Sequence, residues 1–196
     1  KKMSKSQGNV VTPEPLIDQF GADCVRYWAG RARTGVDTAF DEQVFKVGKR
    51  LATKLFNATK FVLGRFEGID PGMLGPERIT HEMDRAVIRE LRPLIERATA
   101  AFEQFDYAQS LQLTEDFFWS TFCDNYVELS KPRTYEEELS EGRLSAASTL
   151  RLVLRALLRM FAPFMPFLTE EIWHWAYAGD ADMNESIHRS AWPALE

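Results

Sequence analysis

Cysteine is scarce in this sequence of 196 residues, which contains only Cys24 and Cys123. These two lie far apart, and neither has a second cysteine at the short spacing of a zinc knuckle. The three histidines also lack a mutual spacing that suits a metal ion. We therefore expect two reduced thiols packed among apolar neighbours, and no metal bound by this chain.

Long apolar runs are also missing. No segment approaches the roughly 20 apolar residues that span a bilayer, and the first residues lack the apolar core of a signal peptide. We therefore expect a cytoplasmic protein without a membrane partner. Because the chain starts at Lys1 with a motif already under way at Lys2, we also expect it to begin inside a longer polypeptide.

Charge is unevenly distributed along the chain, whose net charge is −5. Residues 1–65 hold 12 Lys and Arg against 6 Asp and Glu, a net charge of +6, and the remaining residues carry −11. This asymmetry indicates that one end meets a polyanion, although a simple drift of charge along a helical protein would also produce it. A nucleic-acid partner is therefore compatible with the acidic total.

Apolar residues recur every three or four positions along most of the chain, which is the period of an α-helix. The clearest helix runs from Asp41 to Gly64. Asp41 is placed to cap it, and Phe40 and Phe45 have the spacing of a hydrophobic staple. Before it, we expect a short helix that is capped by Thr12 and a second one over residues 22–33.

Further helices are expected over residues 80–105, 107–131, 143–161 and 167–177. The turn at Asp106 is so short that the helices on either side of it should be antiparallel neighbours. No convincing strand pattern occurs outside the last ten residues. The predicted fold is therefore all-α, with a helical bundle over residues 41–196 and a small loop and helical appendage over residues 1–40.

The first residues carry a motif with chemical content, Lys2-Met3-Ser4-Lys5-Ser6, which is followed by Gly8. Two ammonium groups on a short loop can stabilise the charge that a leaving pyrophosphate gains in a transition state. A lysine-rich frayed terminus would explain the lysines alone. The full pattern, which continues as Gly8-Asn9-Val10-Val11, Pro13 and Gly21-Ala22-Asp23, resembles the KMSKS signature of the class I aminoacyl-tRNA synthetases.

This resemblance implies that ATP, accompanied by Mg²⁺, is a substrate of the parent enzyme. It gives catalytic roles to Lys2 and Lys5, and it places Met3, Ser4 and Ser6 around the ATP together with the lysines. Two positions depart from the pattern, Gln7 where many relatives have a basic residue and Thr12 where Asp is frequent. These departures put only the fine tuning of ATP affinity in doubt.

Four later stretches resemble the synthetase branch for valine, isoleucine and leucine, and they favour valine. The zinc-binding cysteine pairs that often follow in isoleucine enzymes are absent here. The four stretches are Gly35-Val36-Asp37 with Phe40-Asp41-Glu42, then residues 54–62, 122–129 and 163–173.

The resemblance implies a monomeric parent that joins valine to tRNA(Val). This chain would supply the lysine loop and a helical domain that binds the anticodon stem. It has no Rossmann fold, no partner signature for the lysine loop and no editing domain, so we expect it to be catalytically inactive alone. A piece of an isoleucine enzyme and an autonomous tRNA-binding module remain alternatives.

Basic residues gather on one face of the expected helix from Asp41 to Gly64, away from its apolar stripe. Such a face could follow a phosphate backbone, although an ordinary solvated surface explains any single residue equally well. Core packing is the favoured explanation for the tryptophans and phenylalanines of the later helices. The candidate RNA-binding residues are Lys46, Lys49, Arg50, Lys54, Asn57 and Lys60.

Overall fold

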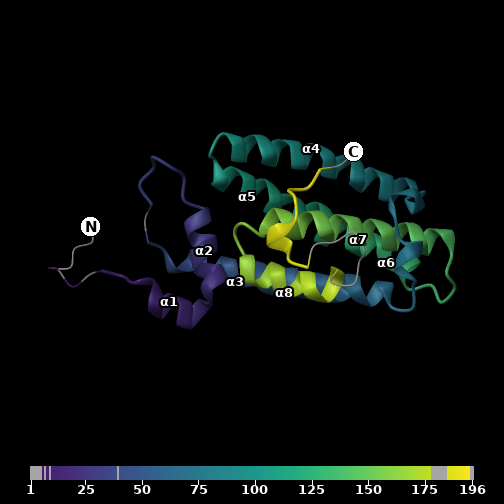
Figure 1. Cartoon of the computed structure of the whole chain (residues 1–196), viewed down its shortest axis with the longest axis horizontal. Coiled ribbons are helices and arrows are strands. Elements are labelled where there is room, and N and C mark those ends of the chain that lie inside the picture. Colours follow the sequence, from purple (N-terminus) through teal and green to yellow (C-terminus); the bar gives the residue numbers. More distant parts are fainter. Residues whose placement is uncertain (1–5, 7, 9, 39, 178–184, 195–196) are drawn as a thin grey trace.

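The computed structural model describes residues 6, 8, 10–38, 40–177 and 185–194. The expected all-α class is confirmed, because the described residues form helices and turns without a strand (Figure 1). The α-helices are α1 (Pro13–Phe20), α2 (Ala22–Gly30), α3 (Glu42–Phe66), α4 (Glu82–Glu103), α5 (Tyr107–Asp116), α6 (Glu128–Thr134), α7 (Glu141–Phe161) and α8 (Pro166–Tyr177). The shorter elements are the 3₁₀ turns η2 (Pro71–Met73), η3 (Pro76–Arg78) and η5 (Ile187–Arg189) and the π-helix η4 (Phe117–Val127).

Helix α7 forms the centre of the bundle. It packs against α3, α4, α5, α6 and α8, and nearly all of its residues from Leu144 to Phe161 are buried. In Figure 1, α4 runs along one side of the bundle, and α3 and α8 run along the other. Residues that are exposed on α3 and on α4 therefore belong to different surfaces.

The start of α3 agrees with the sequence analysis. The Oδ1 atom of Asp41 accepts a hydrogen bond from the backbone N–H of Gln43 at 2.9 Å. The rings of Phe40 and Phe45 lie 5.7 Å apart, as a hydrophobic staple requires. Thr12 is the N-cap residue of α1, as expected, but its side chain makes no capping hydrogen bond. One reason is that Pro15, at the third helical position, has no N–H to donate.

The expected helix over residues 107–131 exists, but its middle is not an α-helix. Between α5 and α6 the chain adopts the π-helix η4, and the helical path continues to Thr134. The backbone hydrogen bonds of η4 close over five residues instead of four. Phe118, Phe122 and Tyr126 follow one another at intervals of four and are all buried. Three aromatic rings of η4 therefore lie in the core.

The N-terminal appendage packs directly on the bundle. Helix α2 buries Cys24 and Tyr27, and Tyr27 belongs to the same hydrophobic core as α3 and α7. The Asp23 carboxylate accepts hydrogen bonds from the backbone N–H groups of Phe167 and Leu168, at 3.1 and 2.7 Å, and so caps α8. The predicted division at residue 40 stays a prediction, and the two parts share one core.

Candidate nucleic-acid interface

Helix α3 separates apolar and basic side chains onto different faces. Its buried residues, which include Leu51, Leu55 and Val62, face the core. The predicted RNA-binding residues lie elsewhere on its circumference. Lys54 is half-buried, and the exposed ones are Lys46, Lys49, Arg50, Asn57 and Lys60.

Five of these six residues line one hollow of about 470 Å³. The hollow is completed by Thr53 and by Trp119, which comes from the π-helix η4. The Arg50 guanidinium carbon lies 5.3 Å from the centre of the Trp119 ring, and the Lys54 ammonium lies 5.9 Å from it. The structure therefore brings an aromatic ring and two cations together. The lining residues are Lys46, Lys49, Arg50, Thr53, Lys54, Asn57 and Trp119.

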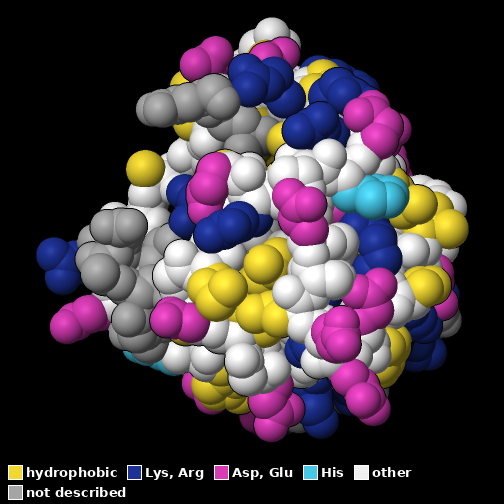
Figure 2. Space-filling view, turned by 90° about the vertical axis from the view of Figure 1, so that its right-hand side faces the viewer, with side chains coloured by type: hydrophobic (Ala, Val, Ile, Leu, Met, Phe, Trp, Pro, Cys, Tyr) yellow, Lys and Arg dark blue, Asp and Glu magenta, His cyan; other side chains and the backbone are white. Residues whose placement is uncertain are grey.

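Among the described residues, no carboxylate lines this hollow, so its charge is of one sign. Opposing charges are mixed at the end of the bundle shown in Figure 2, where Lys, Arg, Asp and Glu side chains surround a hydrophobic patch. Lys60 does not reach the hollow, and its ammonium lies 5.8 Å from the Phe56 ring. The hollow is therefore a local positive site on a protein of negative net charge.

Trp119 was not among the residues that the sequence analysis connected with RNA. It does pack against the core, and its ring lies 5.6 Å from that of Phe118. It is also half-buried, so part of the ring faces the hollow. No signal in the sequence places it there, because the contact joins η4 to α3, which lies more than 50 residues earlier in the chain.

The lysine loop gives no geometry. Lys2, Met3, Ser4 and Lys5 lie outside the described residues, and Ser6 is exposed. The roles predicted for these five residues therefore stay predictions.

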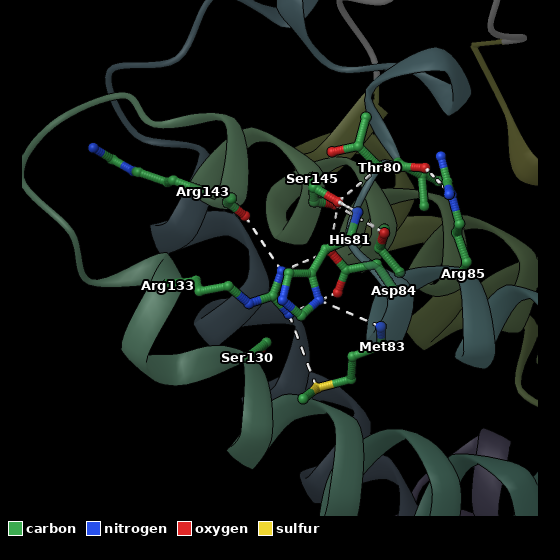
Figure 3. Close-up of polar contacts among 12 residues, drawn as sticks. Thr80, His81, Met83, Asp84, Arg85, Ser130, Arg133, Arg143 and Ser145 are labelled. Carbon is green, nitrogen blue, oxygen red and sulfur yellow. Dashed lines mark hydrogen bonds and ion pairs between the residues drawn. The ribbon is translucent and has the colours of Figure 1, made fainter.

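The most extensively hydrogen-bonded buried carboxylate is that of Asp84, on α4 (Figure 3). Arg133 donates to both of its oxygens at 2.7 Å, the Tyr126 hydroxyl donates to Oδ1 at 2.8 Å, and the Ser145 hydroxyl donates to Oδ2 at 2.6 Å. The Ser145 oxygen in turn accepts the backbone N–H groups of Thr80 and His81, each at 3.1 Å. We call Asp84, Arg133, Tyr126 and Ser145 the Asp84 clasp.

The clasp is structural and offers no reactive group. Burial alone would raise the pKa of Asp84, but hydrogen bonds from Arg133, Ser145 and Tyr126 outweigh it and hold that pKa below its usual range. The carboxylate is fully buried, so a substrate cannot reach it. The clasp joins α4, η4, α6 and α7 through one charge.

The described residues contain no group of three or more His, Cys, Asp and Glu side chains that could hold a metal ion. None of the described helices combines the length and the apolar character that crossing a bilayer requires.

Two protein-family models match parts of this chain. Residues 84–196 match the model of the anticodon-binding domain of tRNA ligase. Residues 1–41 match the model of the class I tRNA synthetases for I, L, M and V. The chain therefore belongs to the family of tRNA ligase anticodon-binding domains, as the resemblance of its motifs indicated.

Curated relatives of this chain are tRNA ligases for one amino acid, valine. The chain is 50% identical to the Valine--tRNA ligase of Cutibacterium acnes, covering 100% of this chain and 21% of that protein. The same enzyme from Salinispora tropica is 49% identical, over 98% of this chain and 22% of the relative. The chain thus spans about a fifth of the length of these curated relatives.

Solved structures support the fold. A LeuRS–tRNA–LeuAMS ternary complex from Agrobacterium radiobacter superposes with a TM-score of 0.74 at 23% identity, covering 98% of this chain and 22% of that chain. Methionyl-tRNA synthetase from Mycobacterium tuberculosis gives a TM-score of 0.69 at 18% identity, covering 88% of this chain and 37% of that chain. At these identities the likeness concerns the fold alone.

Proposed function

We propose that this chain is the tRNA-contacting part of a tRNA ligase specific for valine. The parent would activate valine with ATP to valyl-adenylate, release pyrophosphate and transfer the valyl group to tRNA(Val). The observation that carries the proposal is the hollow on α3, where cations and an aromatic ring meet. Similarity to Valine--tRNA ligases at 50% identity supports valine over isoleucine.

The hollow suits RNA on physical grounds. Lysine and arginine on α3 would contact backbone phosphates, which position an RNA without reading its sequence. Trp119 would stack on an unpaired base, since RNA is mostly read through splayed bases that lie on aromatic rings. The Arg50 guanidinium lies beside the Trp119 ring. A base stacked on that ring would therefore have a cation next to it that can contact its own phosphate.

A binding measurement with a tRNA(Val) transcript tests this proposal. Charge reversal by Lys46→Glu with Lys49→Glu should weaken binding at least tenfold and flatten its salt dependence by about one unit of slope for each lost phosphate contact. Reversal of two exposed arginines on other elements, Arg78→Glu in η3 with Arg97→Glu in α4, is the matched control and should change binding much less. Equal losses in both pairs would refute a specific role for the hollow.

The stacking role of Trp119 has its own test. Stacking of one base on an aromatic ring contributes about 1–3 kcal/mol, so Trp119→Leu should weaken binding by about tenfold or more while Trp119→Phe restores most of it. Circular dichroism checks that both variants keep the fold. If Trp119→Leu binds tRNA(Val) as tightly as the unchanged chain, the ring does not contact the RNA.

In the parent, ATP and its Mg²⁺ would meet the lysine loop, with Lys2 and Lys5 in catalytic roles and Met3, Ser4 and Ser6 beside the nucleotide. This proposal rests on the motif and on the class I match over residues 1–41. Lys5→Ala in a ligase that contains this chain should lower ATP–pyrophosphate exchange strongly. The chain alone should show no exchange, and measurable exchange would contradict its assignment as part of a catalytic unit.

An autonomous tRNA-binding module is the second candidate function, and the basic hollow supports it as well. The module would bind tRNA without any need for a catalytic domain. Comparing the affinities for tRNA(Val) and tRNA(Ile) distinguishes the two functions. A preference for tRNA(Val) supports the valine ligase, and equal affinities support a general RNA-binding module. We further propose that the parent is monomeric and works in the cytoplasm, which sedimentation and cell fractionation would test.

A further inference from the structure

A second basic site lies on another surface, between α4 and α7. It is a cleft of about 600 Å³ to which α4 contributes Arg85, Arg89 and Arg92, and α7 contributes Arg155 and Arg159. We call it the arginine cleft. Residues 66–196 hold only 12 Lys and Arg against 23 Asp and Glu. Five of these 12 cations gather in one cleft of an otherwise acidic segment.

The spacing of the arginines gives the cleft two basic walls. Arg85, Arg89 and Arg92 are separated by four and three residues, so they project from one side of α4. Arg155 and Arg159 are separated by one helical turn on α7. Among the described residues, no carboxylate lines the cleft. An anion that enters it would therefore meet guanidinium groups from two helices.

Several of these guanidinium groups keep unused hydrogen-bonding capacity. Arg85 donates through Nε to the carbonyl of Ile79 at 3.2 Å, and Arg89 pairs with Glu82. Arg159 donates to the carbonyls of Arg155 and Ala191, at 3.4 and 3.3 Å. The buried Nε of Arg155 has no hydrogen-bond partner within the described residues. A buried N–H without a partner is costly, so a turn of the Arg155 side chain that brings Nε to a bound anion would be favourable.

The two cations of α7 also repel each other. Burial and the nearby charge of Arg155 lower the pKa of Arg159 to about 10. Arg159 is still charged at neutral pH. A bound anion would offset both the desolvation and the repulsion.

The part of the cleft lining that is not arginine is apolar, which restricts the kind of anion. We call these residues the apolar floor: Pro76, Ile79, Ile88, Leu152, Ala156 and Ala194. A bare phosphate or an extended phosphate backbone has no apolar part to place on this floor. A ligand with a planar ring and several negative charges matches both the apolar lining and the arginines. Cavities of about 300–1,000 Å³ are typical of small-molecule sites.

We propose that the arginine cleft binds a nucleoside polyphosphate, with the phosphates between the arginines of α4 and α7 and the base on the apolar floor. Guanidinium groups bind phosphate oxygens through paired hydrogen bonds and stack on planar rings, which lysine does less well. All five cations of the cleft are arginines. This site is separate from the hollow on α3 and does not depend on the proposed tRNA contact.

Fluorescence titration of this chain with an N-methylanthraniloyl derivative of GDP tests the proposal. We expect saturable binding that excess GDP and ATP reverse. Arg92→Gln and Arg155→Gln should each weaken the binding by about tenfold, because each removes charge-assisted hydrogen bonds. Arg97→Gln removes the same charge from an exposed position of α4 that lines neither the cleft nor the hollow, and it should leave the binding unchanged. Circular dichroism would confirm that each variant folds.

Two further arms identify which part of the ligand is recognised. Leu152→Ser should weaken GDP binding while competition by inorganic pyrophosphate stays the same, because only the base needs the apolar floor. A short single-stranded RNA should compete less well than GDP. Absence of binding at millimolar GDP, or equal binding by the arginine variants, would overturn the proposal. RNA binding that depends on the arginines, without GDP binding, would overturn it in favour of a strand-binding site.

Discussion

The Asp84 clasp should be the largest single polar contribution to the stability of this bundle. Asp84 is fully buried, and only 14% of the Arg133 side chain is exposed. Removing one member of a buried ion pair typically costs about 3–5 kcal/mol, because the other charge stays buried without a partner. Asp84→Asn and Arg133→Met should therefore each lower the free energy of unfolding by about this amount.

The double variant distinguishes a coupled pair from two independent residues. Asp84→Asn with Arg133→Met leaves no buried charge, so its loss of stability should be smaller than the sum of the two single losses by roughly 2 kcal/mol or more. Urea unfolding followed by tryptophan fluorescence measures all four proteins. If the losses add to within about 0.5 kcal/mol, Asp84 and Arg133 are not coupled and the clasp does not act as one unit.

A neighbouring exposed pair provides the control. Lys131 lies on α6, two residues before Arg133, and it pairs with Glu128. Their side chains are 38% and 57% exposed. Exposed pairs contribute about 0–1 kcal/mol. Lys131→Met should therefore have a small effect, which shows that the loss in Arg133→Met comes from burial and not from removing a cation from α6.

Three further predictions concern pH and backbone geometry. The pKa of Asp84 is lower in the folded state than in the unfolded chain, so its contribution to stability is present above about pH 4. This contribution is lost as the pH falls through the folded pKa. The free energy of unfolding should therefore fall less steeply with acid in Asp84→Asn than in the unchanged chain. In Gly48→Ala the new Cβ would lie 2.7 Å from the Tyr27 ring, and guanidinium unfolding should show a loss of about 1–3 kcal/mol; an unchanged midpoint would mean that α2 is not held against α3. Phe105 has a φ of 62° in the turn between α4 and α5 and is 69% exposed. Thermal unfolding should therefore show Phe105→Gly more stable by about 1 kcal/mol, and an equal gain in Phe105→Ala would show that backbone strain is not the cause.

Much of the fold could be predicted because it depends on contacts within one helix. The cap at Asp41, the staple of Phe40 on Phe45 and the apolar stripe of α3 are all encoded at spacings of five residues or fewer. The separation of basic and apolar faces on α3 follows from the same periodicity. Five of the six residues predicted on its basic face therefore line a single hollow.

The features that escaped prediction join distant segments or depart from the α-helical period. Trp119 lies in the π-helix η4 and Arg50 lies on α3, 69 residues earlier, so the period of a single helix could not place the two side chains together. The clasp joins Asp84 to Arg133 and Ser145, which are 49 and 61 residues away. The arginine cleft likewise takes its arginines from two helices. Their positions in the sequence do not indicate that they lie together, because this depends on how α4 packs on α7.

The negative charge of the remaining surface gives the two basic sites their significance. A polyanion that approaches this protein is repelled by most of the acidic segment, which carries a net charge of −11 over residues 66–196. Among the described residues, the hollow on α3 and the arginine cleft are lined by cations and would attract the polyanion, and like charges elsewhere disfavour other orientations. A uniformly basic protein would bind RNA tightly but in many registers. On an acidic protein, the position of the basic sites determines how the RNA is oriented. Neutralising surface carboxylates should therefore raise non-specific RNA binding without improving the preference for a particular tRNA.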